Sequence, residues 1–500
     1  MSDMKRRTAS SDTDHSAKSN SKVLSSYYDS LLTLKEDLQL AQSMRSRSMV
    51  LMAGGIGAGL VISVIAVVHP AVALVWAAMP LVLACFAAKN YIRAGKVWRN
   101  IERRTEYYKR GIDRLTGAWQ GRARTGEEFA RKNHLYQTDL NVIGEGSLFE
   151  LLCTVRSEFG AERLADYLLE PISLAESKSR QMAVGELRGN SSLRERMSSL
   201  VDFRSEDASF STFRGWLSLP HLVCPGWLRP LLLLSSGCSL LLGIGLLSHI
   251  FLSGLTLAVL GGMVAFKITV AGRVDAWAEF EALQAIAGYA YEEPDAIFPE
   301  LLDGAPIFET TQLGHPLLDG DSCVRNDIAF NPRSQFYLMT GSNMAGKSTI
   351  LRTIGLDAVI AFAGGPIRAS QAKLSSMAIC SSLTLSDSLL DGRSKFLAEV
   401  TRLGETIKLA RSGRAVLFLI DEILSGTSSR DRTRSVASIV KALADCGAVG
   451  AISTHDHSLC KTIYPSAGSG VLFHMESPVP DDPLLFDYLL KPGGGNQLQR

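Results

Sequence analysis

The sequence lacks the cysteine patterns that mark disulfide-bonded and zinc-binding proteins. Its eight cysteines are scattered and form no CxxC pair. This spacing supports neither a disulfide framework nor a zinc site, and free, buried thiols are the expected state. The chain also carries little net charge, because 50 Asp and Glu nearly balance 52 Lys and Arg. A formal charge of +2 over 500 residues gives no global electrostatic reason for nucleic-acid binding.

Two segments lack every Asp, Glu, Lys and Arg. They run from 48 to 88 and from 230 to 266, which is 41 and 37 residues. About 20 helical residues cross a bilayer core of about 30 Å, so each segment is long enough for two spans. The breaks are expected at His69-Pro70 and Ser248-His249. Buried core helices of soluble proteins are shorter and carry flanking charge. We therefore expect four transmembrane helices in two hairpins.

Basic residues flank both apolar segments, whereas the two turns have none. Arg45 and Arg47 precede the first segment, and six basic residues follow it between positions 89 and 104; Arg229 and Lys267 bracket the second. By the positive-inside rule, both termini and the rest of the chain should lie in the cytoplasm, which fits a multi-pass protein of a bacterial inner membrane. A polar stretch of 47 residues precedes the first apolar segment, so we do not interpret that segment as a cleaved secretory signal.

Composition also divides the remainder of the chain. The N-terminal residues are rich in Ser, Thr, Asp and Lys, which is typical of disorder, and short β-prone runs alternate with helical stretches after position 306, which is typical of an α/β domain. We expect a disordered tail at 1–25, an amphipathic helix at 26–48, hairpins at 49–88 and 229–267, helical connectors at 89–134 and 268–305, a helical core at 135–228 and the α/β domain at 306–500.

The strongest pattern is a phosphate-binding loop. Residues 341–348 read GSNMAGKS, which fits GxxxxGK[ST], between the apolar run 336–339 and the helical run 350–360. In this context backbone N–H groups and the helix dipole hold a phosphate, Lys347 reaches the β- and γ-oxygens, and Ser348 coordinates Mg²⁺. The expected ATP-binding residues are Gly341, Ser342, Asn343, Met344, Ala345, Gly346, Lys347, Ser348 and Thr349.

Two further strand ends carry polar side chains. The apolar run 416–420 ends in Asp421 and Glu422, and the run 448–452 is followed by Ser-Thr-His, ending at His455. Alone, an acidic pair could open an exposed helix, and a lone histidine is more often structural. Together with the P-loop they favour nucleotide hydrolysis, with Asp421 and Ser348 as Mg²⁺ ligands and Glu422, His455 and Lys347 as catalytic residues. No other metal is indicated.

These segments resemble motifs of the MutS family. The resemblance covers residues 340–349 (TGSNMAGKST), 394–399 (SKFLAE), 421–428 (DEILSGTS) and 453–455 (STH), and also residues 314–317, 326–328 and 486–493 on either side. A weaker similarity at 146–171 extends into the start of that family's helical core. The resemblance implies a P-loop ATPase domain of the ABC type, part of a helical core, and ATP with Mg²⁺ as ligands.

The same resemblance implies a homodimer and also shows where the chain departs from the family. In the family two ATPase domains pair, so Ser394, Gly426, Thr427 and Ser428 are candidates to complete the partner's nucleotide site. Cys323 stands where many members carry an aromatic residue that stacks on adenine. A tail and a hairpin replace the mismatch-reading domain, which implies a membrane-anchored variant that does not read mismatches.

Three functions stay open at this stage. The favoured one is a membrane-anchored ATPase dimer in which ATP-driven closure moves the helical core relative to the hairpins. The second is a membrane-tethered ATPase of DNA binding or repair, which neutral charge and the missing domain disfavour, although a local basic face can hide in a neutral total. The third is a transporter. Leu424-Ser425-Gly426 is superficially similar to the ABC transporter signature but follows the acidic pair, and the spans lack ionisable residues for an ion route.

Overall fold

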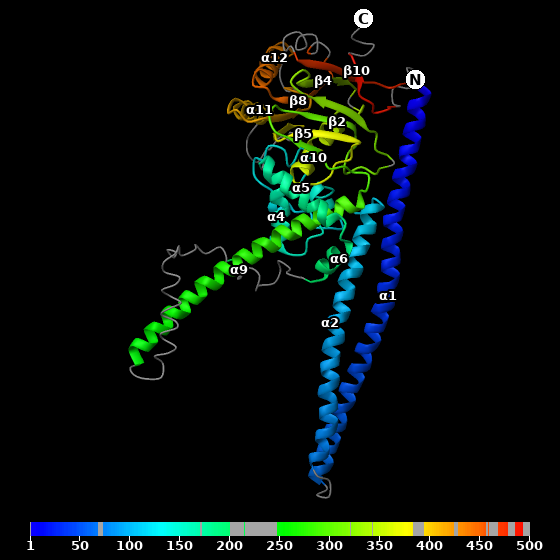
Figure 1. The fold of residues 1–500 in the computed structure, drawn as a ribbon, viewed down its shortest axis with the longest axis vertical. Coiled ribbons are helices and arrows are strands. Elements are labelled where there is room, and N and C mark those ends of the chain that lie inside the picture. Colours follow the sequence, from blue (N-terminus) through cyan, green and yellow to red (C-terminus); the bar gives the residue numbers. More distant parts are fainter. Residues whose placement is uncertain are drawn as a thin grey trace. The chain divides into compact units, whose positions relative to one another are not determined.

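The computed structural model describes residues 2–68, 74–170, 173–200, 215, 248–320, 322–342, 344–383, 395–424, 429–456, 459, 469–478 and 486–493. The chain forms two compact units. One comprises 1–154, 165–200 and 283–500, and the other comprises 155–164 and 201–282. A helical hairpin and two β-sheets belong to the first unit (Figure 1).

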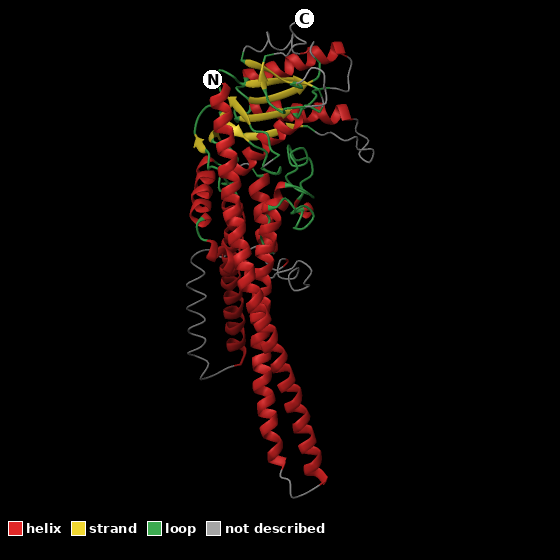
Figure 2. Ribbon diagram, turned by 90° about the vertical axis from the view of Figure 1, so that its right-hand side faces the viewer, coloured by secondary structure: helices red, strands yellow, loops and turns green. Residues whose placement is uncertain are grey.

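The hairpin consists of two long helices that lie side by side. Helix α1 (Ser2–Val68) is followed by a short 3-10 helix (Leu74–Ala77) and by α2 (Ala78–Leu115) (Figure 2). Away from the turn, the two helices share a seam of buried apolar and aromatic side chains: Tyr27, Leu31, Leu34, Ala41, Ile101, Tyr107 and Tyr108. Nearer the turn the backbones approach closely, because a Cβ on Gly55 would lie 2.8 Å from the Pro80 carbonyl oxygen. The amphipathic helix and first hairpin are therefore one continuous structure.

Two helix boundaries differ from the prediction. Residues 1–25 were expected to be disordered, but from Ser2 onward their backbone is helical and belongs to α1. Extending an existing helix is favourable because each added residue gains a backbone hydrogen bond. The connector expected at 89–134 is α-helical only to Leu115 and contains beyond it one 3-10 turn, Glu127–Phe129. Beyond Leu115, Gly117, Gly121 and Gly126 adopt positive φ, which ends α-helical structure and turns the chain.

Four membrane spans were expected, and the described part of the structure contains two candidate helices for them. Within its described part, two segments, 21–68 and 75–115, are long and apolar enough to cross a membrane. The predicted break at His69-Pro70 and the first span of the second hairpin lie outside the described residues. Helix α9 (Ser248–Glu292) begins at the other predicted break. It ends two residues before Pro294, where a helix is disfavoured.

The segment predicted as a helical core contains four helices in the part that the structure describes. It contains α3 (Leu148–Leu152), α4 (Glu158–Leu169), α5 (Leu174–Arg188) and α6 (Ser191–Leu200). Ser147 caps α3 by accepting a hydrogen bond from the Glu150 backbone, and Ser173 caps α5 in the same way through Glu176. Apart from Gly215, which is helical, residues 201–228 of the predicted core lie outside the described residues.

Two sheets form the α/β domain. The first has the order β1-β5-β2-β3, from β1 (Glu300–Leu302), β2 (Phe308–Leu313), β3 (Asn326–Phe330) and β5 (Gln371–Ser375). The second has the order β10-β9-β4-β8-β7-β6, from β4 (Phe336–Gly341), β6 (Ala378–Ser382), β7 (Val416–Ile420), β8 (Val449–Thr454), β9 (Gly470–Met475) and β10 (Lys491–Pro492). Because β1 pairs with β5, the domain begins at Glu300 rather than at the predicted position 306.

Parallel pairing in the second sheet positions the motifs. Strand β4 pairs in parallel with both β8 and β9, and β8 pairs in parallel with β7. Parallel strands place their carboxyl ends at one edge, so the loops after β4, β7 and β8 converge there. The predicted strand runs near 336–340, 416–420 and 448–452 are confirmed. Among the described strands of this sheet, β10 alone is antiparallel to its neighbour.

Helices cover both faces of this sheet. On one face, Phe418 and Ile420 of β7 share a core cluster with Leu403 of α11 (Lys395–Arg411) and Val436 of α12 (Ser429–Asp445). Helix α10 (Lys347–Phe362) lies on the other face, where a Cβ on Gly355 would contact Leu419. The side chains of β7 and β8 are buried throughout, as expected for strands enclosed on both faces.

A buried ion pair joins the hairpin to the end of α9. Arg114 donates from Nε and Nη2 to the two Glu292 carboxylate oxygens, both at 2.6 Å, and their side chains are only 9% and 4% exposed. The Tyr27 hydroxyl adds a hydrogen bond to Glu292 at 3.2 Å. One carboxylate therefore holds α1, α2 and α9 together.

We predict that Glu292→Gln lowers the free energy of unfolding by about 3 kcal/mol, because it leaves the buried Arg114 charge without its partner. The urea midpoint of the detergent-solubilised chain measures this change. Glu300→Gln is the matched control, since its ion pair with Lys373 is more than half exposed, 58% and 57%, and should contribute less than about 1 kcal/mol. Equal shifts for the two variants would contradict the assignment.

Candidate functional site

The phosphate-binding loop joins β4 to α10 through two glycines in the left-handed region. Gly341 has φ 140° and Gly346 has φ 95°, conformations that side chains other than glycine disfavour. A Cβ on Gly341 would also lie 2.3 Å from the Met475 carbonyl oxygen. Helix α10 begins at Lys347, so its unpaired N–H groups face the loop and favour a bound anion.

Lys347 is held inside this loop. Its Nζ donates to the carbonyl oxygens of Gly341 at 2.7 Å and Ser342 at 2.8 Å, and the residue is 2% exposed. Burial lowers the pKa of Lys347, while the nearby carboxylates of Glu422 and Asp421 act in the opposite direction. A phosphate would replace these carbonyls as the partner of a preorganised ammonium group.

Asp421 stands at the end of β7 and accepts two hydroxyl hydrogen bonds. Ser348 Oγ donates to its Oδ2 and Ser453 Oγ donates to its Oδ1. The structure thus brings the two predicted Mg²⁺ ligands, Ser348 and Asp421, into contact. Among the described residues no group of three or more His, Cys, Asp or Glu could hold a metal. Mg²⁺ commonly takes one or two protein ligands together with phosphate oxygens and water, so the hydroxyl and carboxylate fit Mg²⁺ bound with a nucleotide.

Glu422 occupies a turn with unusual backbone geometry. Glu422 and Leu424 have φ of 49° and 51°, which is uncommon for residues other than glycine. His455 Nδ1 lies 2.5 Å from Glu422 Oε2, but the contact does not have hydrogen-bond alignment. Within the described part of the chain, the buried Glu422 oxygens accept no aligned hydrogen bond. A carboxylate with free acceptor capacity beside the phosphate loop can accept a proton from water.

Two residues that the sequence analysis did not assign to the site hold this turn. Glu399 of α11 accepts a hydrogen bond from the Leu424 backbone at 2.7 Å. Arg432 of α12 donates from Nε to the Ile423 carbonyl at 2.9 Å, and its Nη2 lies 3.8 Å from Glu422 Oε2. Arg432 is 7% exposed, so its positive charge is buried near the carboxylate. No motif spacing signals Arg432, because only the folding of α12 beside the turn brings it there.

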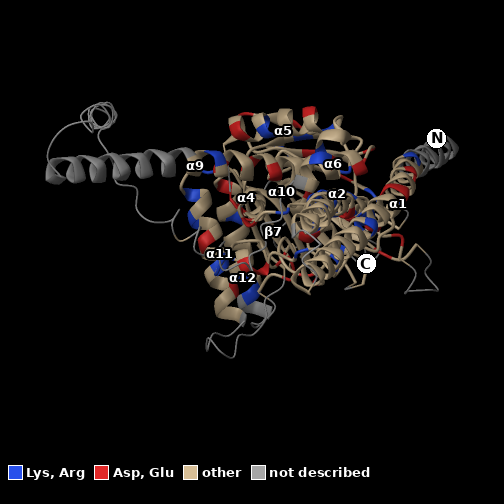
Figure 3. Ribbon diagram, turned by 90° about the horizontal axis from the view of Figure 1, so that it is seen from below, with Lys and Arg blue, Asp and Glu red and all other residues tan. Residues whose placement is uncertain are grey.

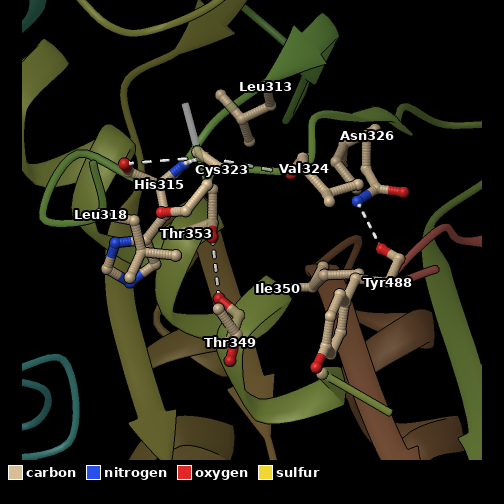
Figure 4. Close-up of a pocket in the computed structure, with 13 residues that line it drawn as sticks. Leu313, His315, Leu318, Cys323, Val324, Asn326, Thr349, Ile350, Thr353 and Tyr488 are labelled. Atoms are coloured by element: carbon tan, nitrogen blue, oxygen red, sulfur yellow. Dashed lines mark hydrogen bonds between the residues drawn. The ribbon is translucent and has the colours of Figure 1, made fainter. Parts of the chain in front are cut away.

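A cavity of about 290 Å³ adjoins the phosphate loop (Figure 4). Its walls come from the loop after β2, from β3, from the first turns of α10 and from the segment at 486–493. The lining residues include Leu313, His315, Leu318, Cys323, Val324, Asn326, Ile328, Gly346, Thr349, Ile350, Thr353 and Tyr488. Mostly apolar walls of this volume suit a small planar ring such as a nucleobase. Cys323 lines the cavity, so a thiol forms part of the wall at the position where the MutS resemblance would place an aromatic residue.

Asn326 closes one side of this cavity. Its Nδ2 donates to the Tyr488 carbonyl at 3.1 Å, and its Oδ1 accepts from the Leu490 N–H at 2.7 Å. The Tyr488 ring contacts Gly346, because a Cβ there would lie 3.0 Å from Tyr488 Cδ1. The two predicted segments at 326–328 and 486–493 therefore meet beside the phosphate loop.

His315 is a neutral residue in the cavity wall. Its Nδ1 accepts a hydrogen bond from the Leu317 N–H at 3.1 Å, which places the ring proton on Nε2. Burial, with the nearby charges of Arg368 and Arg352, lowers the pKa of His315 from 6.5 to about 4. The imidazole is therefore uncharged at neutral pH and can lie beside an uncharged base.

The loop after β2 that contains His315 and Leu318, called the cavity loop below, is linked to the end of α9 through Arg368. Arg368 donates from Nη1 to the carbonyl oxygens of His315 at 3.1 Å and Leu318 at 2.5 Å. The same guanidinium pairs with Glu293, with Nε 3.1 Å from Oε2. Glu293 directly follows Glu292, the residue that binds Arg114 of the hairpin. Successive carboxylates thus connect the cavity loop and the hairpin.

Most of the predicted site residues lie together at the sheet edge. Gly341, Ser342, Lys347, Ser348, Asp421, Glu422 and His455 surround the turns after β4, β7 and β8, and Met344, Ala345, Gly346 and Thr349 complete the described loop and helix start. Asn343 and the four candidates for a partner's site, Ser394, Gly426, Thr427 and Ser428, lie outside the described residues.

Comparison with known proteins agrees with this geometry. Residues 337–497 match the family model of MutS domain V. The chain is 32% identical over 191 residues to the probable DNA mismatch repair protein Msh6 of Drosophila melanogaster, which covers 37% of this chain and 16% of the relative. It is also 32% identical over 188 residues to the DNA mismatch repair protein MutS of Lactococcus lactis, which covers 36% of this chain and 22% of that protein. The chain therefore spans about a fifth of these relatives, and the likeness centres on its domain V region.

We predict that His315 makes the α/β domain less stable in acid. The unfolded chain binds a proton at His315 near pH 6.5 and the folded chain only near pH 4, so the neutral ring stabilises the fold above 6.5 and this contribution is lost as the pH falls to 4. The loss is about 3 kcal/mol. Urea titrations at several pH values should therefore show a weaker pH dependence for His315→Asn than for the natural chain. Parallel pH curves would exclude this role.

Proposed function

We propose that this chain is a membrane-anchored, MutS-like ATPase that binds and hydrolyses ATP as a dimer and couples the nucleotide to movement of its helices. The observation that carries the proposal is the convergence of Lys347, Ser348, Asp421 and Glu422 at one sheet edge, next to a nucleobase-sized cavity. The match of residues 337–497 to MutS domain V supports it independently.

Each residue then has a chemical role. Lys347 and the α10 N-terminus bind the phosphates, and Asp421 and Ser348 would hold Mg²⁺, which neutralises charge on the transferring phosphoryl group. Glu422 orients the attacking water and accepts its proton. His455, 2.5 Å from Glu422, positions that carboxylate or contacts the phosphate once nucleotide binds. The apolar cavity takes the base.

Membrane anchoring rests on the exposed surface of the hairpin. From Ser48 to Val68, α1 is apolar over 21 residues, about 31 Å, which matches a bilayer core. Large apolar side chains of this segment and of the start of α2 face outward, including Val50, Leu51, Leu60, Val61, Val64, Val82, Leu83 and Phe86, each at least 58% exposed. Seen from its turn end in Figure 3, the near part of the hairpin carries neither blue nor red positions. A core helix of a soluble protein would bury such a surface.

Coupling rests on the end of α9. The Glu293–Arg368 pair contacts the cavity loop, and the Glu292–Arg114 pair contacts the hairpin. Arg188 of α5 donates to the Pro294 carbonyl at 3.0 Å, and Gln284 of α9 donates to the Arg194 carbonyl of α6 at 2.8 Å. A shift of the loop upon nucleotide binding would therefore reach both the hairpin and the helical core.

The dimer follows from the MutS resemblance. Residues near Ser394 and at Gly426–Ser428 would complete the nucleotide site of a second copy. Turnover should then depend on the concentration of the chain where monomers and dimers exchange.

We predict that Lys347→Ala abolishes nucleotide binding, because it removes the ammonium group that contacts the phosphates. Glu422→Gln should retain Mg·ATP and lose turnover by at least about 100-fold, because the amide accepts no proton. Phosphate release and equilibrium nucleotide binding by the purified full chain separate these effects. Glu405→Gln, at an exposed position of α11, is the control and should match the natural chain. Ordinary hydrolysis by the Glu422 variant would refute the assigned base.

A matched pair of substitutions tests the anchor. Leu60 lies near the middle of the apolar segment and Leu40 lies outside it, and both are 62% exposed. Leu60→Asp should sharply reduce the fraction of protein that resists alkaline extraction from membranes, because Asp at a span centre is unfavourable by about 3 kcal/mol. Leu40→Asp should leave that fraction unchanged. Equal extraction of both variants, or full solubility of the natural chain without detergent, would contradict anchoring.

A DNA-related function is the second candidate, because the relatives named above are mismatch repair proteins. Their likeness to this chain centres on the nucleotide-binding region, which leaves the partner open. A gel shift with duplex and branched DNA at several salt concentrations discriminates the two, since phosphate contacts weaken steeply with salt.

A further inference from the structure

A basic face follows the apolar part of α2. Lys89, Arg93, Lys96 and Arg99 are spaced by four, three and three residues, which places them along one side of a helix, and all four are exposed. The side of α2 that contacts α1 carries Ala87, Ala94 and Ile101 instead, which are buried. The basic face therefore points away from the hairpin seam.

The basic face begins where the apolar surface ends on both helices. Arg45 of α1 donates to the Tyr91 hydroxyl of α2 at 3.1 Å, so these positions are level across the hairpin. The Arg45 guanidinium also lies over the rings of Tyr91 and Trp98, at 5.1 and 5.5 Å. Aromatic residues of this kind mark the level of lipid headgroups in membrane proteins. Lys89 lies at the apolar side of this level, and the other three basic residues follow away from it.

These charges lack an acidic partner among the described residues. No Asp or Glu occurs between positions 38 and 101, whereas six basic residues do. In the part of the chain that the structure describes, Lys89, Arg93, Lys96 and Arg99 form no ion pair. Further along α2 the pattern changes, because Arg104 pairs with Glu195, Arg110 with Glu106 and Arg114 with Glu292. Ion pairs therefore neutralise Arg104, Arg110 and Arg114, whereas the four proximal basic residues have no such pair within the described part and are available to an external anion.

The surroundings of the four residues favour a lipid as that anion. Phe86, Ile92 and Val97 are 64%, 57% and 53% exposed and lie before and between the basic side chains. Lys and Arg can bend toward headgroup phosphates while their alkyl stems and these apolar side chains contact acyl chains. A free phosphate or a nucleic acid would make no use of the apolar part.

We propose that this face of α2, the basic face of Lys89, Arg93, Lys96 and Arg99, is a binding site for anionic phospholipid headgroups. The proposal rests on the membrane anchoring proposed above and adds a preference among lipids. Lipid binding there would fix how deeply the hairpin enters the bilayer. It would hold the part of α2 around Lys89–Arg99 at the membrane surface, on the membrane side of Arg114.

The test measures binding of a pyrene-labelled phosphatidylglycerol to the full chain in uncharged detergent, by energy transfer from tryptophan. The quadruple variant Lys89→Gln, Arg93→Gln, Lys96→Gln and Arg99→Gln should bind the lipid at least about tenfold more weakly. A charge-preserving variant that exchanges Lys and Arg at these positions should retain binding. The control removes four exposed basic residues of the α/β domain, Arg333, Lys408, Arg411 and Arg414, and should bind as the natural chain does.

Competitors identify the ligand. Unlabelled phosphatidylglycerol should displace the probe, whereas phosphatidylcholine and glycerol phosphate should not. Displacement by glycerol phosphate would make the site one for soluble phosphates, displacement by duplex DNA would make it a nucleic-acid site, and equal binding by all variants would remove the site; each result overturns the proposal. Alkaline extraction of the natural chain and of the same variants distinguishes this inference from the proposed anchoring. A natural chain that stays in membranes but shows no lipid preference refutes only this inference, whereas a natural chain that is released from membranes refutes anchoring itself.

Discussion

The parallel pairing of β4, β8 and β7 is the constraint on which the candidate nucleotide site depends. Residues 341, 421 and 455 are far apart in the chain, and only the register of these strands brings their loops to one edge. The strands are enclosed on both faces, so a slip in register would disrupt the core as well as the site. Packing of α10, α11 and α12 against the sheet therefore fixes the distances among Lys347, Asp421 and Glu422 that the chemistry requires.

The sequence predicted this part of the molecule well because its signals are local. The phosphate loop combines a strand, glycines and a helix start within a few residues, and apolar runs of four or five residues mark β4, β7 and β8. The helix in the connector was predicted too long, because Gly117 and the following glycines adopt positive φ and end it. Strand β1 was missed because three residues carry too little pattern.

Features that depend on distant segments could not be predicted. The walls of the cavity come from four separate parts of the chain, and Arg432 reaches the Glu422 turn only because α12 lies beside it. The ion pairs of Glu292 and Glu293 could not be predicted either, since two glutamates at a helix end usually face solvent. Here the first binds the hairpin and the second binds the cavity loop, which gives one short segment two different partners.

The glycines near the turn of the hairpin have a mechanical consequence. Gly55 and Gly59 stand one helical turn apart, and added Cβ atoms would meet Pro80 and Ala84 in the first case and Leu81 in the second. At this end small residues let the backbones touch, whereas at the other end interlocking tyrosines join them. Because they are joined near the turn and again at Tyr27, the paired parts of α1 and α2 behave as one stiff rod, so a tilt imposed on either helix is carried by both.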